Sequence, residues 1–297
     1  MTGTRRAAVA GTLLLLVAAL ACRRGGGAPD PEGADSLAGA RSMVEQARYD
    51  EAIASLGDRA DAEALYLLGR AWAGKAEAAA VPTPPPGSPA TAGPPLKAEE
   101  ERALALFERA VAERPDHAAA HLAIARMLAP HALAAAARAD AAPAGGATVD
   151  RVLRSFGNAI QADPGGTAAV EAMIQFATRA GRRADADAGF QELIRRRRED
   201  PDLLVRYGDF LVGAGGNAEG ALDQYGQALI WRPDDAATRL KMADIHLAAA
   251  AAQIAQQQWS TAEARLRQAR KFTVDPASPQ AVRLRELEGR LREIRGR

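Results

Sequence analysis

Histidine and cysteine are the residues in this sequence that could do metal or nucleophilic chemistry, and both are scarce. The chain has four histidines and one cysteine in 297 residues. His117 and His121 are four residues apart, which would place both imidazoles on one helix face, where they could bind a metal ion. No glutamate follows His117 and no third ligand is evident. We therefore expect a packing or surface role, with a metal-binding enzyme as the alternative hypothesis.

Two common catalytic signatures are absent from the sequence. The glycines at 25–27 and 145–146 are not followed by the Lys-Ser or Lys-Thr of a phosphate-binding loop, and no Gly-x-Ser-x-Gly elbow occurs. We predict no catalytic residues, no bound metal and no cofactor. The net charge of +1 gives no indication of nucleic-acid binding. The run Arg195 to Arg198 is expected to be a solvated helix end, where positive charge complements the helix dipole.

The single cysteine, Cys22, lies at the end of a processing signal. Arg5 and Arg6 precede an uncharged apolar run of about 15 residues, too short to span a bilayer as a helix but typical of a secretory signal. The sequence Ala-Leu-Ala-Cys at 19–22 resembles the lipobox of bacterial lipoproteins. That resemblance implies cleavage after residue 21 and acylation of Cys22. The alternative is an ordinary signal peptide cut nearby.

The resemblance also bears on location. Arg23 follows the cysteine where an aspartate would resemble an inner-membrane retention signal, so the resemblance implies the outer membrane, with the chain facing the periplasm. Residues 22–32 are rich in glycine and proline and are expected to form a flexible tether.

Composition favours an all-helical chain. Alanine, the best intrinsic helix former, accounts for 73 of the 297 residues, and aromatic residues make up only 4%. Small residues suit helices that pack closely together. A single cysteine excludes an internal disulfide framework.

Two patterns recur along the chain and indicate an internal repeat. One has successive spacings of four, three and five: Ala103, Phe107, Ala110, Pro115; Val152, Phe156, Ala159, Pro164; and Ala221, Tyr225, Ala228, Pro233. Shorter copies are Ala186, Phe190, Leu193 and Ala262, Leu266, Ala269. The other pattern interleaves with it: Leu65, Leu68, Gly69, Trp72 and Leu204, Tyr207, Gly208, Leu211. Residues three and four apart share one helix face, so each pattern predicts a helix with one apolar side.

These patterns resemble the tetratricopeptide repeat (TPR), a pair of helices in which a small residue lets the two helices approach closely. The resemblance implies an all-α, right-handed superhelical solenoid of about six helix pairs, with a C-terminal capping helix at 281–297. The solenoid is expected to cover 33–280, with repeats near 33–61, 62–117, 118–166, 167–200, 201–235 and 236–280. Trp72, Trp231 and Trp259 stand at or beside repeat core positions, and we expect them to pack there.

Three insertions are expected at the turn between the first and second helix of a repeat. Residues 81–96 carry seven prolines and predict a polyproline-like or disordered loop. An alanine-rich stretch at 130–142 leads into a predicted loop at 143–146, and residues 250–258 lengthen the sixth repeat. Insertions on one edge of a solenoid often serve binding, although tolerated drift of surface loops is an equal alternative.

The resemblance implies that the first helix of each repeat lines a concave groove. It also implies that the residue directly after the small residue of that helix points into the groove. Along the array these residues are Arg41, Arg70, Arg126, Gln175, Asp209 and Asp244. Those four positions earlier are mostly apolar: Leu37, Tyr66, Leu122, Glu171, Val205 and Leu240. The charge passes from basic to acidic, which suits an extended peptide or helix of complementary charge. The alternative is that so short a series sorts this way by chance.

Together these features predict a lipid-anchored TPR scaffold for a bacterial envelope complex. Similar lipoproteins assist pilus secretins, outer-membrane protein insertion or polysaccharide export. The predicted partners are a protein or peptide in the groove and a membrane through the N-terminal lipid. The remaining alternatives are the metal-binding enzyme and a purely structural envelope module.

Overall fold

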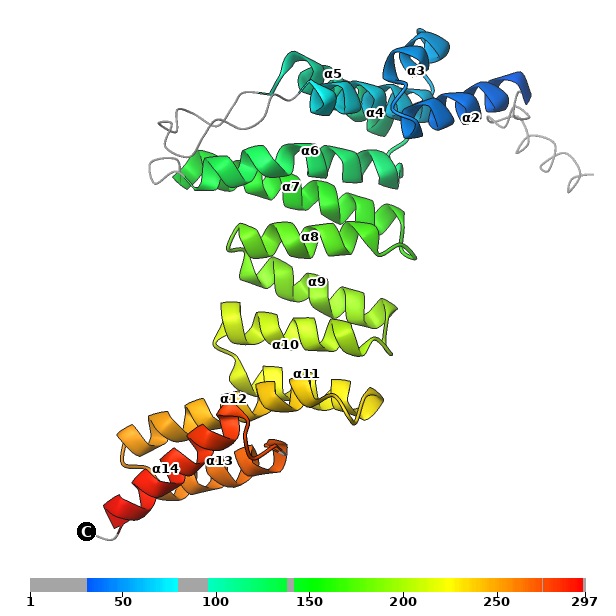
Figure 1. The fold of residues 1–297 in the computed structure, drawn as a ribbon. Coiled ribbons are helices and arrows are strands. Elements are labelled where there is room, and N and C mark those ends of the chain that lie inside the picture. The colour runs from blue at the N-terminus through cyan, green and yellow to red at the C-terminus, as the bar shows by residue number, and fades with distance from the viewer. Residues whose placement is uncertain (1–30, 80–95, 138–141, 274, 296–297) are drawn as a thin grey trace, which may run out of the picture. The chain divides into compact units, whose positions relative to one another are not determined.

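The structure is a computed structural model that describes residues 31–79, 96–137, 142–273 and 275–295. Every regular element within these ranges is an α-helix, so the all-α prediction is confirmed (Figure 1). The helices are α2 (Pro31–Glu45), α3 (Tyr49–Leu56), α4 (Ala62–Ala78), α5 (Ala98–Glu113), α6 (Ala118–Ala136), α7 (Ala142–Ala162), α8 (Ala168–Arg179), α9 (Arg183–Arg196), α10 (Pro201–Gly215), α11 (Ala218–Trp231), α12 (Ala236–Ala255), α13 (Trp259–Phe272) and α14 (Pro279–Arg295). No described helix is both long enough and apolar enough to cross a membrane.

The chain divides into two compact units, Met1–Ile124 and Ala125–Arg297. In the first unit, α2 packs on α3 and α4, and α4 and α5 form the most extensive helix pair. In the second unit, α8 pairs with α9, α10 with α11 and α12 with α13, and each pair also contacts the next (Figure 1). The elements are therefore consecutive helix pairs, the arrangement that the repeat predicts.

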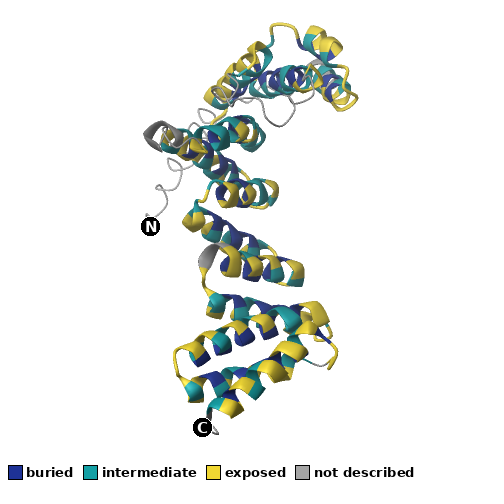
Figure 2. Cartoon of the chain, turned by 60° about the vertical axis from the view of Figure 1, so that its left-hand side comes forward, coloured by how far each residue is buried: buried dark blue, intermediate teal, exposed yellow. Residues whose placement is uncertain are grey.

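The repeated positions form the core of these pairs. The residues of the four-and-three pattern are buried on the inward faces of α5, α7, α9, α11 and α13, and Figure 2 shows exposed residues on the outward faces. The bulky central residues of these helices are Phe107, Phe156, Phe190, Tyr225 and Leu266, each 4% exposed or less. Burying an aromatic or leucine side chain contributes about 1.5–3 kcal/mol, so these positions stabilise each pair.

Two glycines in the first helices permit the close approach of the paired helix. A Cβ atom on Gly69 of α4 would lie 2.6 Å from Cε1 of Phe107 in α5. A Cβ atom on Gly208 of α10 would lie 2.4 Å from Cε1 of Tyr225 in α11. Both distances are far shorter than ordinary carbon contacts of about 3.5–4.0 Å. The ring of the second helix therefore occupies the space that a side chain would need.

The fourth pair places its glycine on the opposite helix. In α8 the position that glycine holds in α4 and α10 is held by Ile174, which is 3% exposed. The close approach is made instead by Gly189 of α9, where a Cβ atom would lie 2.6 Å from Cγ1 of Ile174. The sequence pattern alone did not reveal this exchange. It aligns matching positions of successive repeats and does not show which residues of two paired helices are in contact.

Several element boundaries differ from the expected ones. The loop expected at 143–146 is helical, since α7 begins at Ala142. Proline is tolerated in a first helical turn, where its missing N–H has no intrahelical acceptor, so Pro143 does not prevent this start. Likewise α2 begins at Pro31, inside the expected tether. Residues 1–30, which include Cys22, and residues 80–95 of the proline-rich insertion lie outside the described part of the chain.

The last helix packs against the final pair. Leu284 and Leu291 of α14 are buried against a cluster that includes Leu247 of α12 and Leu266 of α13. The outward face of α14 carries exposed arginines, among them Arg285. A polar outer face of this kind keeps the end of a helical array soluble.

Candidate protein-binding surfaces

A pocket of about 630 Å³ lies among α10, α11, α12 and α14 of the second unit. It brings together two predicted groove residues, Asp209 and Asp244. Its apolar wall consists mainly of Val212, Ile245, Ala248 and Ala249, and its remaining polar groups are Tyr225, Lys241 and Arg283. Val212 is 43% exposed, so the wall includes apolar surface open to solvent. A concave, mostly apolar site with a few fixed polar groups is typical of a ligand pocket.

Asp209 is fixed by two donors from the neighbouring helices. Its carboxylate accepts a hydrogen bond from the Tyr225 hydroxyl at 2.7 Å and one from Lys241 Nζ at 2.6 Å. Burial raises the pKa of Tyr225, and the hydrogen bond to Asp209 raises it further, so the hydroxyl stays protonated and donates. Lys241 also neutralises much of the Asp209 charge. The acidic character predicted at this position is therefore largely compensated within the chain.

Asp244 and Arg283 are the other charged groups of this pocket. Asp244 accepts one hydrogen bond, 3.0 Å from Gln280 Nε2 at the start of α14. Arg283 has no carboxylate partner among the described residues. The pocket thus offers one acceptor and one donor beside an apolar wall.

A second pocket of about 500 Å³ in the same unit contains Arg126 and Gln175. It lies among α6, α7 and α8 and is also lined by Glu171, Phe176 and Arg179. Glu171 pairs with Arg197 at 2.8 Å. Charges of both signs meet here, so no single sign dominates this part of the predicted groove.

In the first unit, the predicted groove residues are not gathered into one pocket. Arg41 pairs with Glu63 at 2.8 Å, and Glu63 also lies 3.2 Å from Arg114. Arg70 is half-buried. Tyr66 packs against the ring of Phe107 at a centroid distance of 5.9 Å, so it belongs to the core. The predicted charge series did not include Glu63 or Lys241, which lie on neighbouring helices and reduce the charge of Arg41 and Asp209.

The remaining apolar members of the series are also partly enclosed. Leu37 and Val205 pack against core clusters, and Leu122 and Leu240 are half-buried. These side chains belong mainly to the packing between helices and do not form open apolar sockets.

Comparison with known proteins gives structural neighbours only. No protein-family model and no curated protein matches the sequence. The chain is similar to TTC0263, a TPR protein of Thermus thermophilus, with 18% identity and a TM-score of 0.40 over 71% of this chain and 97% of that one. It is also similar to MamA residues 41-end from Desulfovibrio magneticus RS-1, with 15% identity and a TM-score of 0.43 over 68% of this chain and 98% of that one.

The two histidines considered as metal ligands have different surroundings. His121 Nε2 donates to the carbonyl oxygen of Pro115 at 2.9 Å. His117 is buried, its ring lies 5.1 Å from that of Tyr66, and its Nε2 lies 3.5 Å from a carboxylate oxygen of Glu63. Within the described residues, no group of three or more histidine, cysteine or acidic side chains could hold a metal ion. The His117 ring thus packs beside Tyr66, and the His121 ring is hydrogen-bonded to the turn before α6.

The three tryptophans expected to pack at or beside core positions differ in their surroundings, and the expectation is corrected for Trp231. Trp231 is 50% exposed and the adjacent Ile230 is 74% exposed, so this tryptophan does not pack into the core. Trp259 does pack, against the cluster of α12, α13 and α14. Trp72 is half-buried, and two cations lie near its ring, Lys75 at 5.1 Å and Arg102 at 4.5 Å from the ring centre.

The arginine run at the end of α9 is more than a solvated helix end. Arg196 is only 12% exposed, pairs with Glu192 at 2.8 Å and donates to the carbonyl oxygen of Gly166. Arg197 donates to the Thr167 hydroxyl at 2.7 Å. These bonds tie the end of α9 to the turn before α8. The sequence shows the charges but not the carbonyl groups that they reach.

Proposed function

We propose that this chain is a protein-binding scaffold of the TPR type that holds a segment of a partner against its first helices. The observation that carries the proposal is the pocket where Asp209 and Asp244 meet the apolar wall of Val212 and Ile245. An apolar partner side chain would fill the space beside Val212. A basic or amide group would reach Asp244, and an acceptor would reach Arg283.

The size and chemistry of this pocket support a peptide ligand. Its volume of about 630 Å³ lies within the range of about 300–1,000 Å³ common for ligand sites. The wall supplies hydrophobic area, and the polar groups at its edge would fix the direction of the bound segment. Such a function needs no catalysis by the chain itself.

We propose further that acylated Cys22 anchors the chain to a bacterial membrane, with the scaffold facing the periplasm from the outer membrane. The support is the signal-like run before Cys22 and the residues at 19–22. On this proposal the partner belongs to an envelope complex of the pilus secretin, outer-membrane protein or polysaccharide export type. The lipid would keep the scaffold near the partner's site of assembly.

A matched pair of variants tests the binding site. Val212→Glu places a charge on the apolar wall, whereas Val282→Glu changes a valine of nearly equal exposure, 41%, outside the pocket. We expect crosslinked pull-downs of the full-length protein from native envelopes to lose the partner at least tenfold with Val212→Glu, because a buried charge opposes apolar binding. The Val282→Glu protein should capture it normally.

Circular dichroism and melting curves of both variants establish that they fold. Equal capture by the Val212→Glu protein and the native protein would show that the partner does not use this pocket. If the native protein captured no partner in a saturable manner, the purely structural alternative would replace the scaffold proposal.

A further inference from the structure

The first unit carries a pocket that the predicted groove does not include. Its volume is about 480 Å³, and it lies among α3, α4 and α5. Ile53, Leu65, Leu68, Leu106 and Trp72 supply apolar surface. None of the residues predicted to line the groove contributes to it.

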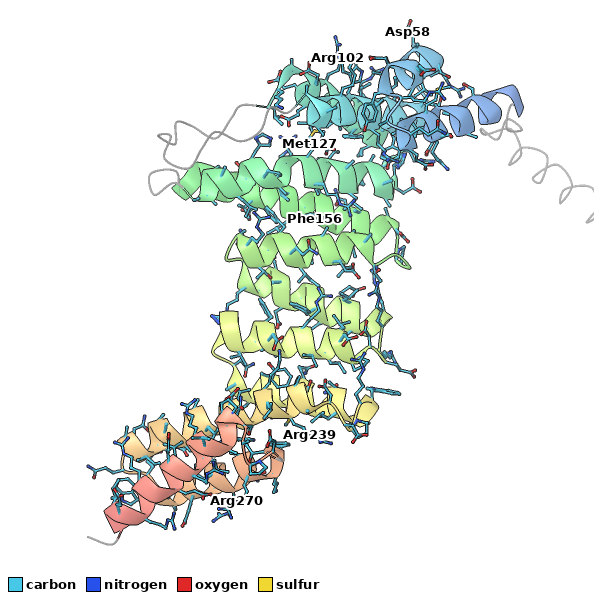
Figure 3. The ribbon with its side chains drawn as sticks, viewed as in Figure 1. Asp58, Arg102, Met127, Phe156, Arg239 and Arg270 are labelled. Carbon is cyan, nitrogen blue, oxygen red and sulfur yellow. The ribbon has the colours of Figure 1, made fainter. Side chains whose placement is uncertain are left out.

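The charges around this pocket are unbalanced. Three arginines line it, Arg59, Arg102 and Arg109, against one acidic residue, Asp58. Figure 3 labels Asp58 and Arg102 on the same side of this unit. Arg59 pairs with Asp61 at 3.0 Å, so its charge is partly compensated.

Arg102 and Arg109 have no carboxylate partner among the described residues. By contrast, Arg41 and Arg114 of the same unit both pair with Glu63, and Arg48 pairs with Glu51. Two unpaired guanidinium groups beside apolar surface are suited to bind carboxylates, because Arg can make two parallel hydrogen bonds to one carboxylate.

Arg102 contacts the Trp72 ring in the absence of a ligand. Its guanidinium carbon lies 4.5 Å from the centre of the Trp72 ring, a cation–π arrangement. Stacking on the ring leaves the N–H groups at the guanidinium edge available to an acceptor. Fixing a long side chain in advance lowers the entropy lost on binding.

The spacing of the two arginines sets a length for the ligand. They are seven residues apart on α5, a rise of about 10 Å along the helix. On an extended chain, carboxylates four residues apart lie on the same face and are separated by about 13 Å at 3.3 Å per residue, a distance that two long arginine side chains can span. The apolar side chain of Leu106 lies between the two arginines in sequence and faces the same pocket.

We propose that this pocket binds an acidic segment of a partner protein, with one apolar or aromatic side chain beside Trp72 and Leu106 and flanking carboxylates on Arg102 and Arg109. A protein segment is favoured over a lipid surface, because membrane binding through charge uses clusters of four to eight basic residues, not two cations around an apolar hollow. This site goes beyond the proposed function, since it gives the chain a second binding surface outside the first-helix groove.

A labelled synthetic peptide tests the proposal. The probe is fluorescein-labelled Glu-Glu-Phe-Leu-Glu-Glu, with a control peptide that has Gln in place of every Glu. Fluorescence anisotropy with the purified full-length protein should show saturable binding of the acidic probe and at least tenfold weaker binding of the control peptide. The affinity should fall as salt is raised, because exposed charges are screened.

Two double variants locate the binding. Arg102→Glu with Arg109→Glu should weaken binding at least tenfold. Arg154→Glu with Arg183→Glu makes the same change of net charge at exposed arginines that do not line this pocket, and should bind as the native protein does. Circular dichroism checks that each folds, and Arg102→Gln with Arg109→Gln replaces the charge reversal if that variant does not.

A third readout places the ligand beside Trp72. In a protein carrying Trp231→Phe and Trp259→Phe, Trp72 is the remaining tryptophan, and its emission should change as the unlabelled acidic peptide binds. The proposal is overturned if the native protein does not bind the acidic probe, if the Gln peptide binds equally, or if both double variants lose the same affinity. It is also overturned if Trp72 emission does not respond, or if anionic vesicles bind at this site and the peptide does not.

Discussion

At the scale of single residues, His117 shows how burial sets the charge state of a side chain. The sequence indicated this histidine only as a candidate for metal binding or packing. Burial lowers the pKa of His117, the nearby Arg114 lowers it further, and Glu63 acts in the opposite direction with less effect. The ring is therefore neutral at pH 7 and packs beside Tyr66. The neutral ring contributes to the protein through this packing contact.

The lowered pKa of His117 predicts a loss of stability in mild acid. The unfolded chain takes up a proton near the ordinary histidine pKa of about 6.5, whereas the folded chain does so only at lower pH. The free energy of unfolding should therefore fall as the pH drops below about 6.5 and level off once the folded His117 is also protonated. His117→Phe, which keeps a ring beside Tyr66, should reduce this dependence.

Urea unfolding of the native and His117→Phe proteins at several pH values measures the effect. His246 also has a pKa lowered chiefly by burial, so part of the pH dependence should remain in the variant. Identical pH dependence in both proteins would contradict a contribution from His117.

At the scale of helices, a glycine at one position decides whether a pair can close. Gly208→Ala should destabilise the α10–α11 pair, because the added Cβ would meet the Tyr225 ring at 2.4 Å and overpacking typically costs about 1–3 kcal/mol. Gly226→Ala on α11 is the control, since nothing lies within 4 Å of a Cβ there. That change should stabilise the helix by about 0.5–1 kcal/mol.

Thermal and urea unfolding of the two alanine variants compares them directly. Equal stability of the Gly208→Ala and native proteins would mean that the helices separate at little cost. The exchange of roles between Ile174 and Gly189 shows that a small residue is needed at the crossing, on either helix.

At the scale of the whole molecule, the proposed membrane anchor depends on Cys22. Removing residues 1–21 takes away two arginines and no acid, so 36 basic side chains stand against 37 acidic ones and offer no net attraction to anionic lipid. Each buried methylene of an acyl chain contributes about 0.8 kcal/mol, so several chains on one cysteine would hold the protein firmly.

Cys22→Ser should therefore release the protein from the membrane fraction and abolish palmitate labelling. Globomycin should block processing of the native chain and have no effect on the variant. Membrane attachment that survives both treatments would show that the anchor is not a lipid on Cys22.

Local patterns in the sequence determined the helices and most of their buried residues. Spacings of three and four place Phe107, Phe156 and Tyr225 on one face of their helices, and this follows from helix geometry without knowledge of the partner helix. The glycines at 69 and 208 were assigned to close crossings through the resemblance to the TPR, and the packing of Phe107 and Tyr225 against them confirms it.

Only the tertiary structure decided which charges meet and where surface remains open. Glu63 reaches Arg41 and Lys241 reaches Asp209 from other helices, so the predicted gradient of charge is weaker than the series suggested. The pocket with Arg102 and Arg109 exists because α3, α4 and α5 pack around it. These contacts join residues far apart in the chain, and their distances depend on how the helices pack, which the periodicity of a single helix does not specify.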